Sequence, residues 1–192
     1  AAAAALNREL VLEHFRGHPP HHRYADLRPT KPDHGYLYIG ESRIAEAHIR
    51  KAGATPSFKG YPGVNPRRPF PASICISIDD EIVHGIPGER VIRAGQVVSI
   101  DAGAIVDGWH GDAARTFYEG DPPAAVAGLI ETTRAAMMAG IAAAVPGNHI
   151  DDISAAVEDV ALPHGYGIIR QFVGHGIGTE MHEEPQVPNY RT

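Results

Sequence analysis

Cysteine is almost absent from this 192-residue sequence, which contains only Cys75. One cysteine excludes an intrachain disulfide and a zinc site built from several thiolates, and it fits a reducing compartment. Long apolar runs are also missing, since no stretch approaches the length of a transmembrane helix. Residues Ala1 to Leu6 lack the basic start and the length of a signal peptide. These absences predict a cytoplasmic protein without a membrane partner.

Basic residues are outnumbered, with 17 Lys and Arg against 23 Asp and Glu, and the net charge is -6. This balance argues against general nucleic-acid binding and leaves only a local basic patch around Arg67 and Arg68. The hydrophobic content of 43% is high enough for 192 residues to bury one sizeable core.

The residues from Val97 to Tyr118 predict a β-hairpin, because an apolar run is followed by an Asp107-Gly108 turn signal and a returning strand. With that turn, Asp112 lies opposite Gly103. Asp101 and Asp112 are then diagonal neighbours on the same face, with backbones about 7–8 Å apart. The hairpin therefore brings two carboxylates together.

Buried carboxylates are costly unless the pKa is raised, a basic partner is present, or a metal is bound. Arg115 is the only base nearby. One interpretation is therefore an aspartate in a turn and an aspartate paired with Arg115. The other is a metal site, because two carboxylates and an imidazole suit Mn, Fe, Co or Zn. Histidines on two Gly-rich turns, His84 and His175, favour the metal.

Several motifs give the chain a specific resemblance that extends from about Arg43 to Tyr190. The sequence resembles the type 1 methionine aminopeptidases, whose motifs occur here in the same order: Cys75-Ile76-Ser77-Ile78, His84-Gly85-Ile86-Pro87, Ser99-Ile100-Asp101-Ala102-Gly103, Gly108-Trp109-His110-Gly111-Asp112, Gly174-His175-Gly176-Ile177-Gly178 and His182-Glu183-Glu184-Pro185. The His-Gly-Ile-Pro motif distinguishes this type from the prolidases and aminopeptidase P, which share the same fold.

The resemblance implies an α+β pita-bread fold, with an antiparallel sheet, helices on its outer face, and an incomplete C-terminus. It also implies a dinuclear metallopeptidase that removes the initiator methionine from nascent chains. Asp101, Asp112 and His175 would be metal ligands, with Asp112 bridging. His84 and His182 would contact the substrate amide and the tetrahedral intermediate.

The resemblance further implies two divalent metal ions, of Co, Mn, Fe or Zn. The N-terminal methionine of nascent polypeptides would be the substrate, and the ribosome is a candidate partner. Four side chains align with the apolar positions that bind the methionine side chain in the family: Tyr61, Phe70, Cys75 and Met181. Aromatic and sulfur-containing side chains suit a flexible thioether. The alternative for each is ordinary core packing, above all for Cys75, because a lone cysteine is usually a buried small hydrophobe.

The family also has two further glutamate ligands beyond the His-Glu-Glu-Pro motif, whereas this sequence ends at Thr192. Glu183 and Glu184 belong to that motif and cannot replace them. We therefore expect residues 1–192 alone to bind metal weakly and to turn over slowly or not at all. The alternative function is a truncated or non-catalytic pita-bread fragment that binds peptide or a partner.

Two domains of unequal character are predicted. Residues 1–40 form an atypical His/Pro-rich extension, with His18, His21, His22 and His34, for which a flexible polar segment is favoured over a metal site. Residues 41–192 form the incomplete aminopeptidase domain. Two smaller departures from the family lie there: Asp79 replaces the usual asparagine, and Pro62 to Pro69 lengthens a link beside the pocket residues.

Four further elements are expected in this domain. A helix over Arg43 to Lys51 should end at Gly53 and turn Ile44, Ala47, His48 and Ala52 toward one face. Ala72 to Ile78 should be a strand. Two helices should follow, over Ala124 to Val145 and from Ile150 to about Val160.

Overall fold

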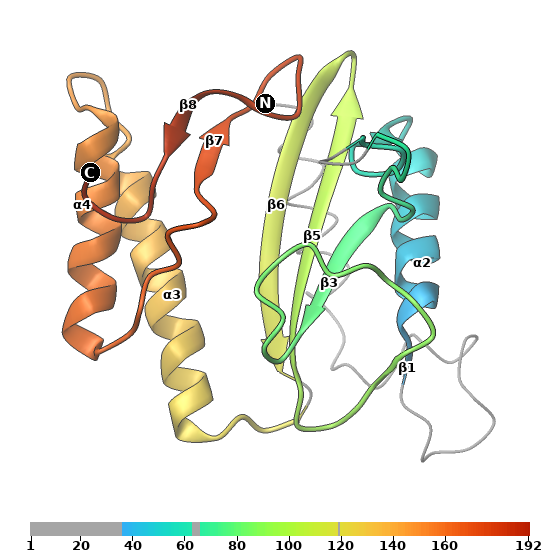
Figure 1. The fold of residues 1–192 in the computed structure, drawn as a ribbon, viewed down its shortest axis with the longest axis horizontal. Helices are drawn as coiled ribbons and strands as arrows, with labels where there is room; N and C mark the ends of the chain where they lie inside the picture. The colour runs from blue at the N-terminus through green and yellow to red at the C-terminus, as the bar shows by residue number, and fades with distance from the viewer. Residues whose placement is uncertain (1–35, 63–65, 119) are drawn as a thin grey trace. The chain divides into compact units, whose positions relative to one another are not determined.

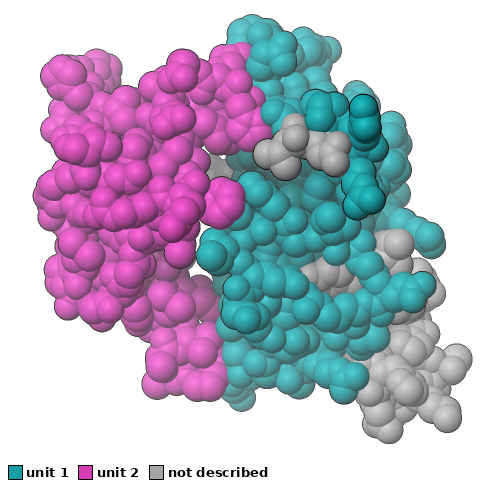
Figure 2. All heavy atoms as spheres, in the orientation of Figure 1, with its two compact units in different colours: residues 1–121, 178–181 teal, residues 122–177, 182–192 magenta. Residues whose placement is uncertain are grey.

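The computed structural model describes residues 36–62, 66–118 and 120–192. It contains two compact units, residues 1–121 with 178–181 (unit 1) and residues 122–177 with 182–192 (unit 2) (Figure 2). The four histidines of the predicted extension lie outside the described residues, as do residues 63–65 of the predicted Pro62–Pro69 loop. The domain boundary at residue 40 therefore stays a prediction.

Unit 1 is built on an antiparallel sheet in which one long strand pairs with three others (Figure 1). Strand β5 (Val97–Val106) pairs with β6 (Trp109–Tyr118) along one edge. Its other edge pairs with β2 (Thr55–Pro56) and β3 (Ile74–Ile78). A separate two-stranded sheet joins β1 (Tyr36–Leu37) to β4 (Val91–Ile92).

The hairpin of β5 and β6 is confirmed, and its turn explains its register. Asp107 has φ 51° and Gly108 has φ 81°, and two such residues in succession form the turn whose twist suits adjacent antiparallel strands. Pairing runs without interruption from Val106 and Trp109 at the turn to Val97 and Tyr118. Asp112 consequently lies opposite Gly103, as predicted.

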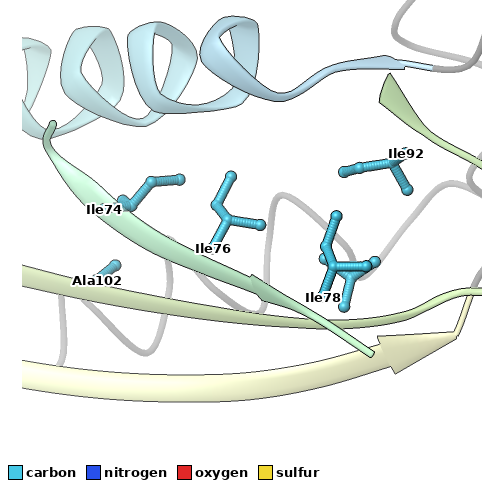
Figure 3. Close-up of a cluster of buried hydrophobic side chains, with 6 residues drawn as sticks. Ile74, Ile76, Ile78, Ile92 and Ala102 are labelled. Atoms are coloured by element: carbon cyan, nitrogen blue, oxygen red, sulfur yellow. The ribbon is translucent and has the colours of Figure 1, made fainter. Parts of the chain in front are cut away.

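The core of unit 1 lies between this sheet and helix α2 (Tyr38–Lys51). Figure 3 shows the cluster with Ile74, Ile76 and Ile78 of β3 beside the helix. Alternate residues of a strand point to opposite faces. The isoleucines therefore face α2, while Cys75 and Ser77, also buried, face the other side of the sheet.

Helix α2 ends as expected before Gly53, which has φ 77°, and of the four residues predicted to share one face only Ile44 is partly buried. Ala47, His48 and Ala52 are exposed, whereas Ile49 is fully buried and Ala45 packs on the core. Ala45 packs against the cluster that contains the isoleucines of β3, and Ile49 packs with Ala54 and Ala104, so contacts outside the helix select its buried face. Sequence periodicity alone could not supply this information.

Unit 2 contains the two predicted helices, α3 (Ala124–Ala143) and α4 (Ile150–Ala161), followed by a 3-10 turn, η2 (Leu162–His164). A two-stranded ribbon completes it, formed by β7 (Gly174–Gly176) and β8 (Glu183–Val187). A largely apolar groove of about 590 Å³ is lined by α3, α4 and the segment that follows η2. No helix in the described part of the chain is long and apolar enough to cross a membrane.

Candidate metal centre and side-chain pocket

Two carboxylates lie on the sheet face opposite α2. Asp101 is directly paired with Cys75 on one side and Ala114 on the other, and Asp112 is paired with Gly103. Because Asp101 and Gly103 are two residues apart, all of these positions are on one face. The structure therefore brings Asp101 and Asp112 together as the sequence predicts.

The electrostatics of this pair are unfavourable in the absence of a cation. The pKa of Asp101 is raised from 3.8 to about 8. Burial is the largest cause, and repulsion from Asp112 and a hydrogen bond with Asp112 add to it. Burial and the same two aspartates raise the pKa of the Cys75 thiol to about 12. In the described part of the chain, Asp112 Oδ1 is also a buried oxygen without a hydrogen-bond partner. Such an oxygen requires an explanation, and a bound cation supplies one.

The alternative partner, Arg115, is not paired with either aspartate. Arg115 follows Asp112 by three positions and so lies on the opposite face of β6. It is exposed, and its guanidinium carbon lies 5.4 Å from the centre of the Phe117 ring. The interpretation of Asp112 as half of an arginine ion pair is therefore wrong.

The residues of unit 1 fit a metal, but they form an incomplete set of ligands. Carboxylate oxygens on one face suit Mn, Fe, Co and Zn. Among residues 36–62, 66–118 and 120–192, no three His, Cys, Asp or Glu side chains form a group that could hold a metal ion. His175 belongs to unit 2, and its convergence on the two aspartates stays a prediction.

Two of the histidines of unit 2, His175 and His182, lie side by side at its ribbon. The rings of His175 and His182 have centres 4.3 Å apart and are tilted by 44°. His175 Nδ1 lies 2.8 Å from Gly176 O. A carbonyl oxygen only accepts, so Nδ1 carries the proton and Nε2 keeps the lone pair that a metal ligand needs. His182 is exposed.

His84 is held in a strained backbone conformation on a loop against β3. Its φ is 61°, a value that a residue with a side chain adopts at a cost and that is common at functional sites. The following residue explains this conformation, because Gly85 O accepts from Ile76 N at 3.0 Å and Gly85 N donates to Ser77 Oγ at 3.1 Å. His84 itself is exposed.

The four predicted pocket residues gather in one cluster of unit 1. Cys75 and Met181 are buried, and Tyr61 and Phe70 pack against them. Tyr61 and Phe70 are also joined through the backbone, because Phe70 N donates to Tyr61 O at 2.8 Å. The described residues of the loop between them are exposed. The described residues of this loop thus lie at the surface, between two members of the cluster.

Three neighbouring residues were missed by the sequence analysis. Phe58 is buried between Cys75 and Met181, and its ring meets Phe70 edge to face at 6.4 Å. Ser57 and His110 form a hydrogen bond beside it, with Ser57 Oγ 3.0 Å from His110 Nδ1. The signal for His110 was present in the sequence, since it precedes Asp112 by two positions on a strand and must share its face.

Comparison with known proteins agrees with this arrangement. The model of metallopeptidase family M24 matches residues 41–192. The chain belongs to this family. Membership of a metallopeptidase family fits two carboxylates that could hold a metal. The matched range begins at the first residue of the predicted aminopeptidase domain.

The relatives of this M24 chain are methionine aminopeptidases. The protein of that name from Clostridium acetobutylicum is 50% identical over 149 residues, which are 77% of this chain and 57% of that protein. Methionine aminopeptidase 1 from Mycobacterium tuberculosis is 48% identical over 162 residues, which are 81% of this chain and 59% of that protein. The chain therefore spans somewhat more than half the length of the curated relatives that it matches.

Solved structures confirm the pita-bread fold for this M24 chain. The methionine aminopeptidase from Rickettsia prowazekii matches with a TM-score of 0.83 and 32% identity, over 100% of this chain and 69% of that one. The prolidase from Pyrococcus furiosus matches with a TM-score of 0.75 at 21% identity, over 98% of this chain and 49% of that one, which shows a common fold alone. The described part of this chain is thus a partial pita-bread domain.

Proposed function

We propose that the protein removes the N-terminal initiator methionine from nascent polypeptides, as a methionine aminopeptidase with two divalent metal ions. One observation carries the proposal: Asp101 and Asp112 lie together on one buried sheet face, with Asp112 Oδ1 lacking any partner among the described residues. A fragment that only binds peptide has no use for two mutually repelling carboxylates. The similarity to methionine aminopeptidases at up to 50% identity supports the same function.

Asp101, Asp112 and His175 would hold the metals. Two bound divalent ions supply an activated water and polarise the scissile carbonyl. The chain's own contribution is positional. The hairpin fixes the two carboxylates through ten consecutive residue pairs, and the Gly176 carbonyl fixes the tautomer of His175.

His84 and His182 would act on the substrate rather than on the metals. Both side chains are exposed, so a peptide can reach them. An imidazole can donate a hydrogen bond to the reacting amide and stabilise negative charge that develops on its oxygen. The constrained backbone at His84 fixes the direction in which its side chain leaves the chain, which suits this role.

The methionine side chain would bind at the cluster of Tyr61, Phe70, Cys75 and Met181. Their aromatic and sulfur-containing side chains form favourable contacts with a thioether. Cys75 is directly paired with Asp101, so the apolar cluster adjoins the carboxylates. A side chain bound at the cluster would therefore place the scissile bond close to the proposed metals.

The substrate suggests where the protein works. Nascent chains that carry an initiator methionine occur at the ribosome, so we propose a cytoplasmic location, with the ribosome as a candidate partner. The ligand types accept Co, Mn, Fe or Zn, and metal availability decides among them.

Metal-dependent release of methionine tests the function. For a protein that carries the complete ligand set, we expect release of methionine from a Met-Ala-Ser peptide, loss of this reaction with a chelator, and its recovery with Mn or Co. The measurement is free methionine before chelation, after it, and after each metal is added back. Activity that survives exhaustive chelation would contradict the proposal.

A His84→Ala variant separates chemistry from metal binding. We expect kcat to fall by roughly 10² or more, because a hydrogen bond to the reacting amide is lost, while metal content stays unchanged. Metal content is measured by elemental analysis on the same samples. Loss of metal or of folding in this variant would instead assign His84 a structural role.

A further inference from the structure

His110 of unit 1 has contacts that the proposed function does not use. It precedes Asp112 by two positions on β6, so both side chains share a face. Its half-buried ring bonds to Ser57 Oγ through Nδ1, at 3.0 Å. Its backbone N–H donates to Gly178 O at 2.7 Å. One residue therefore holds two segments that are far apart in the sequence.

Each of these two segments leads into a buried member of the apolar cluster. Ser57 directly precedes Phe58, and the segment that begins at Gly178 ends at Met181. Phe58 and Met181 pack together with Cys75, and all three are at most 7% exposed. The position of each segment thus depends on a bond to His110.

A glycine makes the bond between His110 and Ser57 sterically feasible. Ser57 N donates to Gly103 O at 2.9 Å, so Ser57 lies beside Gly103, whose other neighbour is Asp112. A Cβ on Gly103 would lie 2.8 Å from Ser57 Cβ and 2.7 Å from Phe58 Cε1. Any larger residue would push this segment away from the sheet.

We propose that His110 is a positioning residue that holds both of these segments of the methionine pocket, with Ser57 as its hydrogen-bond partner. The identity of the pocket rests on the proposed function. The bond ties the segment that carries Phe58 to the strand that carries Asp112. Substrate side chain and scissile bond are thereby kept at a fixed separation.

The rate at which the Cys75 thiol reacts with a reagent measures how well this cluster is closed, and it requires no catalytic activity. Cys75 is the only cysteine in the sequence and is buried against Phe58 and Met181. We expect Ser57→Ala and His110→Ala each to accelerate its reaction with a thiol reagent by about 3- to 10-fold, the effect of one lost hydrogen bond. The double variant should react no faster than the faster single variant, because both substitutions remove the same bond. His110→Asn, which retains a polar nitrogen near Nδ1, should restore slow labelling.

Ser99→Ala is the matched control. It removes a 2.8 Å hydroxyl hydrogen bond to Thr116 on the same sheet, away from the segment of Ser57. We expect no change in Cys75 labelling in this variant. Equal acceleration by Ser99→Ala and Ser57→Ala would mean that labelling follows general stability, and it would overturn the proposal.

Kinetics with the active protein separate positioning from mere packing. We expect Ser57→Ala to raise KM for the Met-Ala-Ser peptide about 3- to 10-fold, to leave kcat within about 2-fold, and to weaken preference for methionine over leucine. Unchanged KM and selectivity would overturn the proposal. If a protein with the complete ligand set releases no methionine, the proposed function fails, while the labelling comparison still decides whether His110 holds the cluster.

Discussion

At the scale of single residues, the loop at His84 depends on a glycine that follows it. Gly85 lies so close to β3 that a Cβ on it would collide with the carbonyl of Ile76. Its N–H and carbonyl both bond to that strand region, through Ser77 Oγ and Ile76 N. Only a residue without a side chain allows this approach, and the approach sets the position of His84.

A Gly85→Ala variant tests this dependence. We expect it to lower the free energy of unfolding by about 1–3 kcal/mol, the usual cost of forcing extra atoms into a packed region. Gly88→Ala is the control, because nothing lies within 4 Å of a Cβ built there. Urea unfolding of both variants provides the measurement. A Gly85→Ala protein as stable as Gly88→Ala would show that the loop yields easily.

The sequence predicts the carboxylate pair well and the histidine contacts poorly. Asp101 and Asp112 lie on strands with a clear turn between them, so counting residues from Asp107-Gly108 gives their register. The strained φ at His84 depends on a distant strand, and so does the bond between His110 and Ser57. Such contacts join residues far apart in the chain, and no local pattern encodes them.

At the scale of elements, α2 is attached to the sheet by a charged network as well as by its apolar face. Glu46 accepts hydrogen bonds from Lys59 Nζ at 2.6 Å, Arg50 Nε at 2.9 Å and Ser73 Oγ at 3.0 Å. Bonds to Lys59 and Arg50 lower the pKa of Glu46 from 4.5 to about 2. Sequence pattern could identify the Glu46 and Arg50 pair on the helix, but not the partners outside it.

This network gives stability a predictable pH dependence. Because the pKa of Glu46 is lowered on folding, its contribution is complete above pH 4.5 and is lost as the pH falls toward 2. We expect Glu46→Gln to cost on the order of 1 kcal/mol at pH 7, since the pairs are partly exposed. The difference from the parent protein should shrink below pH 4.5, in urea unfolding measured from pH 7 to pH 3.

Glu131→Gln is the control for that series. Glu131 pairs with Arg134 on the exposed side of α3, where solvent screens the interaction. We expect little change in unfolding at any of these pH values. A Glu46→Gln difference that is independent of pH would show that the Glu46 charge does not stabilise the fold.

At the scale of the whole molecule, the proposed ligands are divided between the two units. Asp101 and Asp112 belong to unit 1, and His175 belongs to unit 2. The helices of unit 2 are predictable from the sequence, because α3 is a long Ala-rich stretch followed by Pro146-Gly147 and α4 repeats its apolar residues at helical spacing. The pita-bread fold class is predictable from the ordered family motifs. How two units are arranged depends on the surfaces that they present to each other. Local sequence patterns do not encode such an arrangement.

Calorimetric titration tests how far these ligands suffice. A protein of residues 1–192 offers three proposed ligands for two ions, so we expect at most one loosely bound Mn. An Asp112→Asn variant should lose that binding, because one of the proposed ligand carboxylates is gone. Two tight sites in residues 1–192 would show that other side chains complete the centre and would contradict the proposed ligand set.

The uninterrupted pairing of β5 with β6 also limits how this gene region can change over evolution. Both aspartates keep their orientation only while the number of residues in each strand between them and the turn is preserved. Deleting a single residue of β6 between the turn and Asp112 would send the Asp112 carboxylate to the face of α2 unless a bulge absorbed the change. Substitutions in the hairpin should therefore be tolerated more readily than single-residue insertions or deletions.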